Sequence, residues 1–96
     1  MTIEDGPNAT RPYRVRVGGI WYWVDPTVPM AELEPGDTVV IYPVDGAAAL
    51  AILRSGFTRD KPVCFASLQG ENFELPARDI AALHLAAVDD DQAAPR

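Results

Sequence analysis

Few side chains in this 96-residue chain could do covalent chemistry. His84 is the only histidine and Cys64 the only cysteine, and no cluster of metal-ligating residues surrounds either of them in the sequence. A zinc site needs three or four such ligands from the protein. We therefore expect no metal and no cofactor. We expect His84 to be a structural or partly exposed residue of a strand, and Cys64 to be a buried, inert thiol.

Nucleophilic catalysis would need a serine or cysteine beside a base. The candidates are Ser55, Ser67 and Cys64, and no Gly-x-Ser-x-Gly elbow is present. Gly18-Gly19 does not predict a phosphate-binding loop, because neither a lysine nor a helix pattern follows it. Nothing singles out a pair of carboxylates for acid–base catalysis. The sequence therefore predicts that the chain is not an enzyme.

Four residues of one short stretch could do binding chemistry: Arg14, Arg16, Trp21 and Trp23. Arginine and tryptophan are strongly enriched in the hot spots of protein interfaces. A contiguous aromatic patch on a small protein usually marks a partner surface, and the same side chains could stack nucleic-acid bases. Alternatively, the two tryptophans cover a second small core or one end of a barrel. The exposure of their rings decides between these interpretations.

The stretch 13–24, YRVRVGGIWYWV, predicts a β-hairpin that positions these four residues. Its two consecutive glycines suit a two-residue type I′ turn, which needs positive φ at both positions. That turn pairs Arg16 with Trp21 and Arg14 with Trp23 on one face. Each guanidinium could lie over an indole ring, a contact worth about 0.5–1 kcal/mol when exposed. The opposite face carries the expected core residues: Tyr13, Val15, Val17, Ile20, Tyr22 and Val24.

A second hairpin is predicted around the loop Asp45-Gly46, a dipeptide preferred in two-residue turns. The preceding run 38–42, TVVIY, is rich in β-branched and aromatic residues and predicts a strand. Pro43 should interrupt the ladder, so we expect an edge strand or a bulge there. The run 47–53 is also good helix sequence, but the register of the turn favours a strand. With that loop, two apolar pairs face each other: Ile41 with Leu50, and Val39 with Ile52.

The remaining elements are expected to be short. One helical turn is predicted near 30–34, a strand at 62–68 and a return strand at 73–75. The segment 77–88 is ambiguous, since its apolar residues fit both a helical stripe and a strand alternation. We expect a helical turn near 77–82 and a closing strand near 83–88, with a single C-terminal helix as the alternative.

Nine prolines and seven glycines divide the chain into short pieces, which favours strands over long helices. The expected fold is mainly β: a small SH3-like barrel or a rolled antiparallel sheet of about five to six short strands, with one short helical turn. Residues 12–88 should form a single small domain. Residues 1–11 are expected to be a flexible arm, and residues 89–96, DDDQAAPR, a disordered acidic tail.

The net charge of −6 argues against direct nucleic-acid binding, which needs clustered lysine and arginine. No apolar run approaches the roughly 18 residues of a membrane span, and a single cysteine fits a reducing compartment. We therefore expect a soluble cytoplasmic protein with no membrane partner. As an alternative, the acidic residues form a surface that mimics nucleic acid. The candidates for that surface are Glu32, Glu34, Asp37, Asp45, Glu71 and Glu74.

Three stretches together resemble the β-barrel that follows the catalytic core in Mu-type transposases. They are 15–23 (VRVGGIWYW), 35–43 (PGDTVVIYP) and 49–52 (ALAI), and the likeness covers roughly residues 13–66. The family's pattern has an acidic residue or asparagine between the tyrosine and the proline, which Tyr42-Pro43 lacks. The resemblance implies a barrel module without transposition, because no transposase core is present.

A second likeness is to the C-terminal domain of LexA-type self-cleaving repressors. It lies in Met30, in 33–40 (LEPGDTVV) and in the closing segment 72–88. The family's serine precedes its methionine, and here that position is Pro29. The family's lysine lies in a later strand, and here that run is 49–54, ALAILR. The resemblance implies a regulatory domain without self-cleavage.

The sequence thus predicts a non-enzymatic protein-interaction module, of phage or mobile-element origin, that binds a host or element protein. The contact would be the arginine–tryptophan face of the first hairpin. Two alternatives stay open. One is an acidic inhibitor of a nucleic-acid-binding complex, of the anti-CRISPR or antirestriction type. The other is a catalytically dead LexA-type domain.

Overall fold

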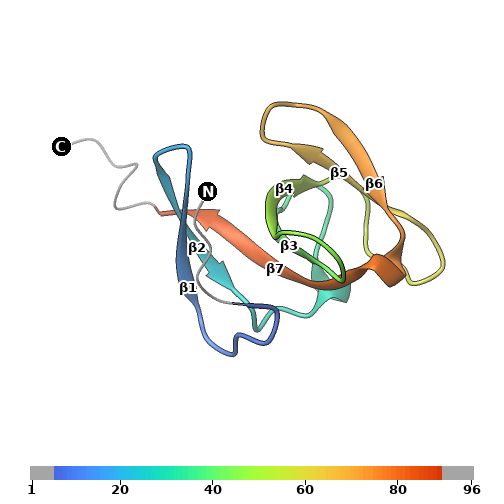
Figure 1. The fold of residues 1–96 in the computed structure, drawn as a ribbon, viewed down its shortest axis with the longest axis horizontal. Coiled ribbons are helices and arrows are strands. Elements are labelled where there is room, and N and C mark those ends of the chain that lie inside the picture. Colours follow the sequence, from blue (N-terminus) through green and yellow to red (C-terminus); the bar gives the residue numbers. More distant parts are fainter. Residues whose placement is uncertain (1–5, 90–96) are drawn as a thin grey trace.

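The computed structural model describes residues 6–89, which form one sheet of seven antiparallel strands. Two single turns of 3-10 helix are the only helical elements in that range. Figure 1 labels the strands. The elements in chain order are β1 (Tyr13–Val17), β2 (Ile20–Asp25), η1 (Met30–Glu32), β3 (Thr38–Pro43), β4 (Ala49–Leu53), β5 (Val63–Ser67), β6 (Asn72–Leu75), η2 (Ala77–Asp79) and β7 (Ile80–Val88).

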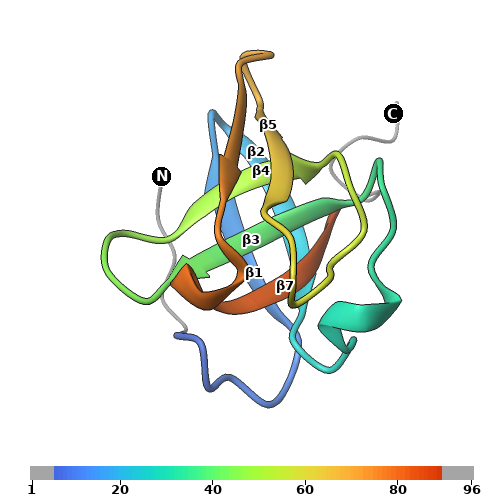
Figure 2. The ribbon, with the colours of Figure 1, turned by 90° about the vertical axis from the view of Figure 1, so that its right-hand side faces the viewer.

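The strands follow the order β1-β2-β7-β3-β4-β5-β6 across the sheet. Strands β1 and β2 lie at one end of the long axis, β5 and β6 lie at the other, and β7 runs between them (Figure 1). Seen from the β5–β6 end, β5 and β6 run upright while β3 and β4 cross the view, so the sheet is strongly twisted (Figure 2). The expected mainly-β fold is confirmed as a rolled antiparallel sheet.

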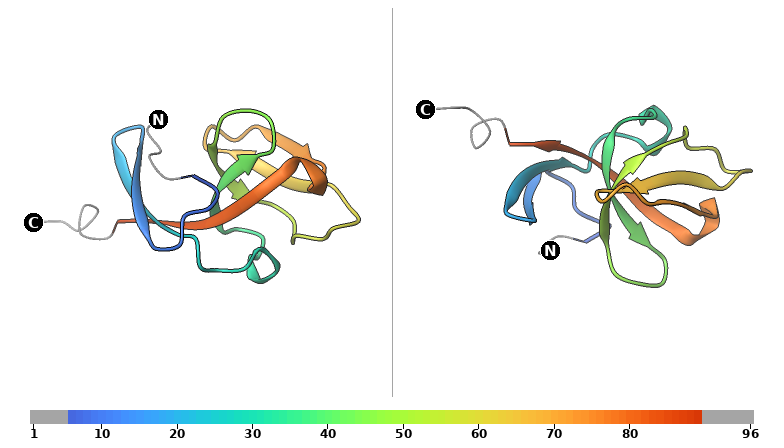
Figure 3. Two further views of the ribbon diagram at one scale, coloured as in Figure 1. Left: turned by 60° about the horizontal axis from the view of Figure 1, so that its bottom comes forward. Right: turned by 90° about the horizontal axis from the view of Figure 1, so that it is seen from above.

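The sheet does not close into a barrel, because β1 and β6 are its two edges and do not pair with each other. The further views show β1 and β2 standing apart from β5 and β6 (Figure 3). There are seven strands where five to six were expected. The rolled form follows from the right-handed twist of each strand, which accumulates across a sheet of this width.

Two cores lie on opposite faces of the sheet, and the strands in its middle contribute to both. Alternate residues of β3 separate accordingly, with Val39 and Ile41 in the first core and Val40 and Tyr42 in the second. The buried residues of the first core are Leu33, Val39, Ile41, Ala51, Leu53, Val63, Phe65, Ile80 and Leu83. Those of the second are Tyr13, Val15, Tyr22, Val24, Val40, Tyr42, Leu50 and Ala86.

The first hairpin has the expected register, with Arg14 opposite Trp23 and Arg16 opposite Trp21. Gly18 and Gly19 both have positive φ, 59° and 82°, as a type I′ turn requires. Four of the six residues of the expected core face are buried. Val17 is half-buried, and Ile20, beside the turn, is exposed.

The predicted register of the second hairpin is wrong by one residue. Ile41 faces Ala49 and Val40 faces Leu50, so Leu50 joins the second core and not the first. The connection runs over 44–48 and is not a two-residue turn at Asp45-Gly46. One cause is visible at the end of β3, where the N–H of Val44 donates to the carbonyl of Asp79 at 2.8 Å.

Strand β3 is an interior strand between β7 and β4, so the expectation of an edge there is wrong. The alternative, a bulge, is confirmed by a shift of register between Tyr42 and Pro43 in the pairing with β7. The helical turn near 30–34 is confirmed as η1. In the ambiguous segment the helical turn ends at Asp79 and the strand already begins at Ile80.

The described part of the expected N-terminal arm, residues 6–11, contains a turn in which the N–H of Ala9 donates to the carbonyl of Gly6. Ala9 packs against the second core. Asp89, assigned above to the tail, is buried and belongs to the folded part. The predictions for 1–5 and 90–96 lie outside the described residues. Among residues 6–89, no helix is long and apolar enough to cross a membrane.

Candidate partner-binding face

Four side chains, Arg14, Arg16, Trp21 and Trp23, lie on one face of the hairpin β1–β2, and we call them the Trp–Arg face. Strand alternation places them there, opposite the second core. Trp23 is 48% exposed and Trp21 is half-buried, while both arginines are exposed. The tryptophans therefore do not form a closed second core, since Trp23 is exposed and Trp21 is partly so.

The guanidinium groups lie against the indole rings, as the register predicts. The Cζ atom of Arg14 lies 4.5 Å from the ring centroid of Trp21 and 5.6 Å from that of Trp23. The Cζ atom of Arg16 lies 5.8 Å from the Trp21 centroid. Arg14 thus contacts both rings, and not Trp23 alone. At these distances a cation is attracted to the negative face of an aromatic ring.

Asp89, which directly follows β7, forms an ion pair with Arg14 across β2. Its Oδ2 lies 2.9 Å from Nη2 of Arg14, and its backbone N–H donates to the carbonyl of Trp21 at 3.0 Å. The carboxylate is buried while the arginine stays partly exposed. Sequence reasoning missed Asp89 because it opens an acidic run. The sequence signal that could have found it is the alternation of Leu83, Leu85 and Ala87, because continuing it by two residues places Asp89 on the same face of the strand.

A hollow of about 270 Å³ adjoins the Trp–Arg face where β2 meets β7. Its lining is mainly apolar: Pro12, Trp23, Val24, Asp25, Leu85 and Ala87. Asp25 sits at the end of β2, and its Oδ1 accepts hydrogen bonds from the hydroxyl and the N–H of Thr27. The hydroxyl bond and then the backbone bond hold the pKa of this exposed carboxyl below its usual value. The exposed ring of Trp23 therefore stands beside a small apolar recess.

Beneath the hairpin, on the opposite face, His84 lies in a buried polar network. Its Nδ1 lies 3.0 Å from the hydroxyl of Tyr13, which lies 2.6 Å from the hydroxyl of Tyr42. The ring also hydrogen-bonds to the backbone of Pro7. Burial lowers the pKa of His84, against smaller raising effects of the Pro7 bond and of Asp25. Of the two expected roles, His84 therefore has the structural one: it is a buried strand residue that ties β1 to β7 and β3.

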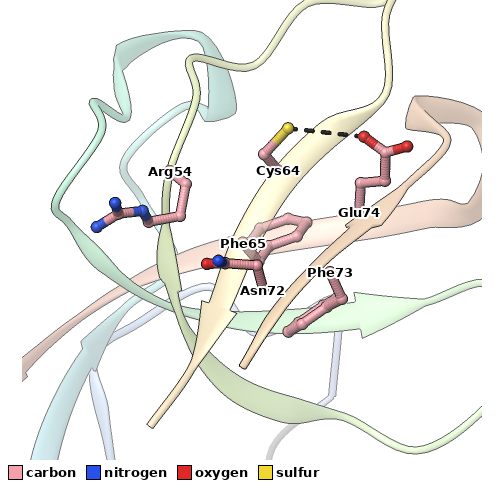
Figure 4. A pocket seen from close by; sticks show the side chains of 6 residues that line it. All are labelled: Arg54, Cys64, Phe65, Asn72, Phe73 and Glu74. Carbon is pink, nitrogen blue, oxygen red and sulfur yellow. Dashed lines mark hydrogen bonds between the residues drawn. The ribbon is translucent and has the colours of Figure 1, made fainter. Parts of the chain in front are cut away.

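Cys64 is half-buried, so the expectation of full burial is wrong. It lies on β5 opposite Glu74 on β6, and its thiol donates to a carboxylate oxygen of Glu74 at 3.8 Å (Figure 4). The serine hydroxyls considered above bond to backbone: Ser55 Oγ accepts from the N–H of Cys64, and Ser67 Oγ accepts from that of Glu71.

The acidic candidates are distributed over three connections of the fold. Glu32, Glu34 and Asp37 lie between β2 and β3, and Asp37 accepts a hydrogen bond from the N–H of Glu34. Asp45 lies in the loop between β3 and β4, while Glu71 and Glu74 belong to the β5–β6 hairpin. Within residues 6–89, no group of three His, Cys, Asp or Glu side chains could hold a metal ion.

Comparisons with known proteins do not place the chain in a family. A scan against protein-family models, a search of curated proteins and a search of solved structures each found no match. The likenesses to the transposase barrel and to the repressor domain therefore stay predictions. The functional argument depends on the geometry of the face itself.

Proposed function

We propose that this chain is a non-enzymatic protein-interaction module that binds a partner protein through the Trp–Arg face. The observation that carries the proposal is the exposure of Trp23, which is 48% accessible although it stands beside a second tryptophan and two arginines. Exposed aromatic side chains cost solubility unless they are covered for part of the time. Tryptophan and arginine together are the residues that most often dominate the energy of an interface.

The arrangement of Arg14 supports a binding role further. Its guanidinium is held between two rings and a buried carboxylate, so much of its side-chain freedom is already lost before a partner arrives. Ordering a long side chain on binding costs about 0.5–1.5 kcal/mol. A face that is organised in advance avoids part of that cost. The hollow beside Trp23 gives a partner's apolar side chain a place to insert.

The transposase likeness adds a proposal for origin, a phage or another mobile element, and for the partner, a host or element protein. In this proposal the chain works in the cytoplasm, without a cofactor. The LexA likeness would instead make it a regulatory domain that dimerises, and the acidic alternative would make it an inhibitor that mimics nucleic acid. No contact in the described residues favours either alternative over the Trp–Arg face.

The test is capture of partners from the native host with the intact chain, followed by mass spectrometry. Three baits are compared: wild type, Trp21→Ala/Trp23→Ala, and Ile20→Ala as a matched control. Ile20 is 46% exposed on the opposite face of the same strand. The proposal predicts a protein captured by wild type and by the control but not by the double variant. Equal capture by all three folded baits refutes it.

Salt separates the proposal from the acidic alternative. Binding through aromatic rings and one or two arginines should weaken only a few-fold between low and high salt. An acidic surface that replaces a phosphate backbone forms many charge pairs, so its binding should fall steeply over the same range. Sedimentation tests the repressor alternative, which requires a dimer.

A further inference from the structure

Strand β1 forms an open edge of the sheet, and its pairing fixes which backbone groups face outward. The turn at Gly18-Gly19 is closed by the pair Val17–Ile20. In a two-residue hairpin this closing pair exchanges both hydrogen bonds, and such pairs then alternate along the ladder. The backbone groups of Arg14 and Arg16 therefore point away from β2.

These outward groups have no partner strand. In residues 6–89, β1 pairs with β2 alone. Within the described part of the chain, no backbone hydrogen bond from outside the strands reaches Arg14 or Arg16. A row of unpaired N–H and C=O groups is a ready template for an added strand. Arg14 and Arg16 therefore offer a strand partner both unpaired backbone groups and basic side chains.

Charge defines what such a strand would carry. Directly opposite residues of two paired strands point to the same face. A residue of an added strand opposite Arg14 or Arg16 would therefore lie on the Trp–Arg face. Asp89, which directly follows β7, already forms an ion pair with Arg14 on this face, with 2.9 Å between its Oδ2 and Nη2 of Arg14. Among residues 6–89 no ion pair involves Arg16, which is exposed, so its guanidinium is the one that a partner's carboxylate would meet.

The acidic residues of the β5–β6 hairpin do not oppose this at close range. Glu71 and Glu74 belong to the β5–β6 hairpin, and β1 and β6 lie at opposite ends of the molecule's long axis (Figure 1). Six strand spacings of about 4.8 Å separate the two edges along the sheet. Exposed charges further apart than a Debye length of about 8–10 Å are largely screened. Asp89 offsets the charge of Arg14, so among residues 6–89 Arg16 supplies the positive charge without an ion pair at the β1 edge.

We propose that the partner contributes an extended acidic segment, which adds to β1 as a further antiparallel strand with a carboxylate opposite Arg16. The partner's backbone bonds to Arg14 and Arg16, and its side chains on the same face contact Trp21 and Trp23. This inference rests on the proposed function and specifies the kind of partner. A second copy of the chain could supply such a strand through β6, where Glu74 lies on the edge, and the test includes that outcome.

The probe is a nine-residue peptide that alternates glutamate with valine, titrated into the ¹⁵N-labelled full chain. The inference predicts slowed hydrogen exchange of the Arg14 and Arg16 amides and shifts of both indole N–H signals. N-methylation of the glutamate nitrogens, which face β1 in this pairing, should abolish binding. N-methylation of the valine nitrogens, which face away, should leave it intact. Equal effects of the two methylated peptides overturn the inference.

Arg16→Glu should weaken the peptide about tenfold, because an attractive cross-strand pair becomes a repulsive one. Arg54→Glu is the matched control, since it changes the net charge equally at an exposed site after β4. Protection of Arg14 and Arg16 in the free chain at low concentration would show that the chain covers its own edge, which overturns the inference. Protection of these amides that appears only at high concentration would show that the edge binds a second copy of the chain, which also overturns the inference.

Failure here is distinguishable from failure of the proposed function. One result is that capture of a partner requires Trp21 and Trp23 while the Arg14 and Arg16 amides exchange as in the free chain. That result supports the proposed function and refutes the added strand. If capture does not depend on the two tryptophans, both proposals are refuted.

Discussion

Acid should destabilise this fold through one side chain. His84 is the only histidine, and its ring is buried between the hydroxyl of Tyr13 and the backbone of Pro7. Because the Pro7 bond favours the charged form, it places a ring N–H on that carbonyl. Nδ1 then accepts from Tyr13, whose oxygen accepts from Tyr42. Protonation of Nδ1 would turn this acceptor into a donor and force the two tyrosine hydroxyls to reverse.

The lowered pKa of His84 determines how the free energy of unfolding changes with pH. Burial holds the pKa of folded His84 below 6.5, so the unfolded chain takes up a proton first as the pH falls. The free energy of unfolding is therefore constant above about pH 7 and decreases as the pH falls through 6.5. It becomes level again below the folded pKa. One proton limits the slope to about 1.4 kcal/mol per pH unit.

Urea denaturation at half-unit steps between pH 7.5 and 5 measures this slope. Carboxylates contribute little there, because their titration begins closer to pH 4. His84→Gln is the control, since it should be less stable at pH 7.5 but should lose most of the slope. A wild-type free energy of unfolding that stays constant or rises toward pH 5 would refute the buried neutral histidine. So would a slope that persists unchanged in the variant.

Three other substitutions test the packing and the face, each by urea denaturation. Gly19→Ala should cost about 1–2 kcal/mol, because its φ of +82° is unfavourable for alanine; an unchanged midpoint would contradict the assigned turn. Phe65→Ala should cost about 3–5 kcal/mol, since the ring is fully buried; a loss below 1 kcal/mol would contradict that packing. A double-mutant cycle of Arg14→Ala and Asp89→Ala should give a coupling of about 0.5 kcal/mol, discounted for the exposure of the arginine; a coupling of zero would show that the pair does not hold Arg14 in solution.

The first hairpin was predictable residue by residue, and the second was not. Two adjacent glycines favour a two-residue type I′ turn, whose twist matches that of the strands. The position of this turn determines which residues of β1 and β2 lie opposite each other. Asp45-Gly46 carries a similar local signal, but Gly46 has a φ of 119° and lies in a longer loop. There the bond between Val44 and Asp79 competes with the turn, and Asp79 is 35 residues away in the chain. A local pattern holds no information about such a contact.

The same limit applies to the site. Alternation alone places Arg14, Trp21 and Trp23 together, since the three lie on adjacent strands of one hairpin. It does not reveal the pairing of Arg14 with Asp89. That pairing requires β7 to lie beside β2, and the local sequence pattern does not predict the order of the strands in the sheet. The His84 network joins residues 71 positions apart. The sequence predicted a structural role for His84 and a core position for Tyr13, but only the fold shows that the two side chains form a hydrogen bond.

The central claim is that the Trp–Arg face carries the binding energy of this chain. Titration calorimetry of the captured partner against wild type, Trp21→Ala/Trp23→Ala and Ile20→Ala tests it most directly. We expect the double variant to bind at least about 100-fold more weakly, as for the loss of two hot-spot residues, and Ile20→Ala to bind like wild type. A folded double variant with the dissociation constant of wild type would contradict it.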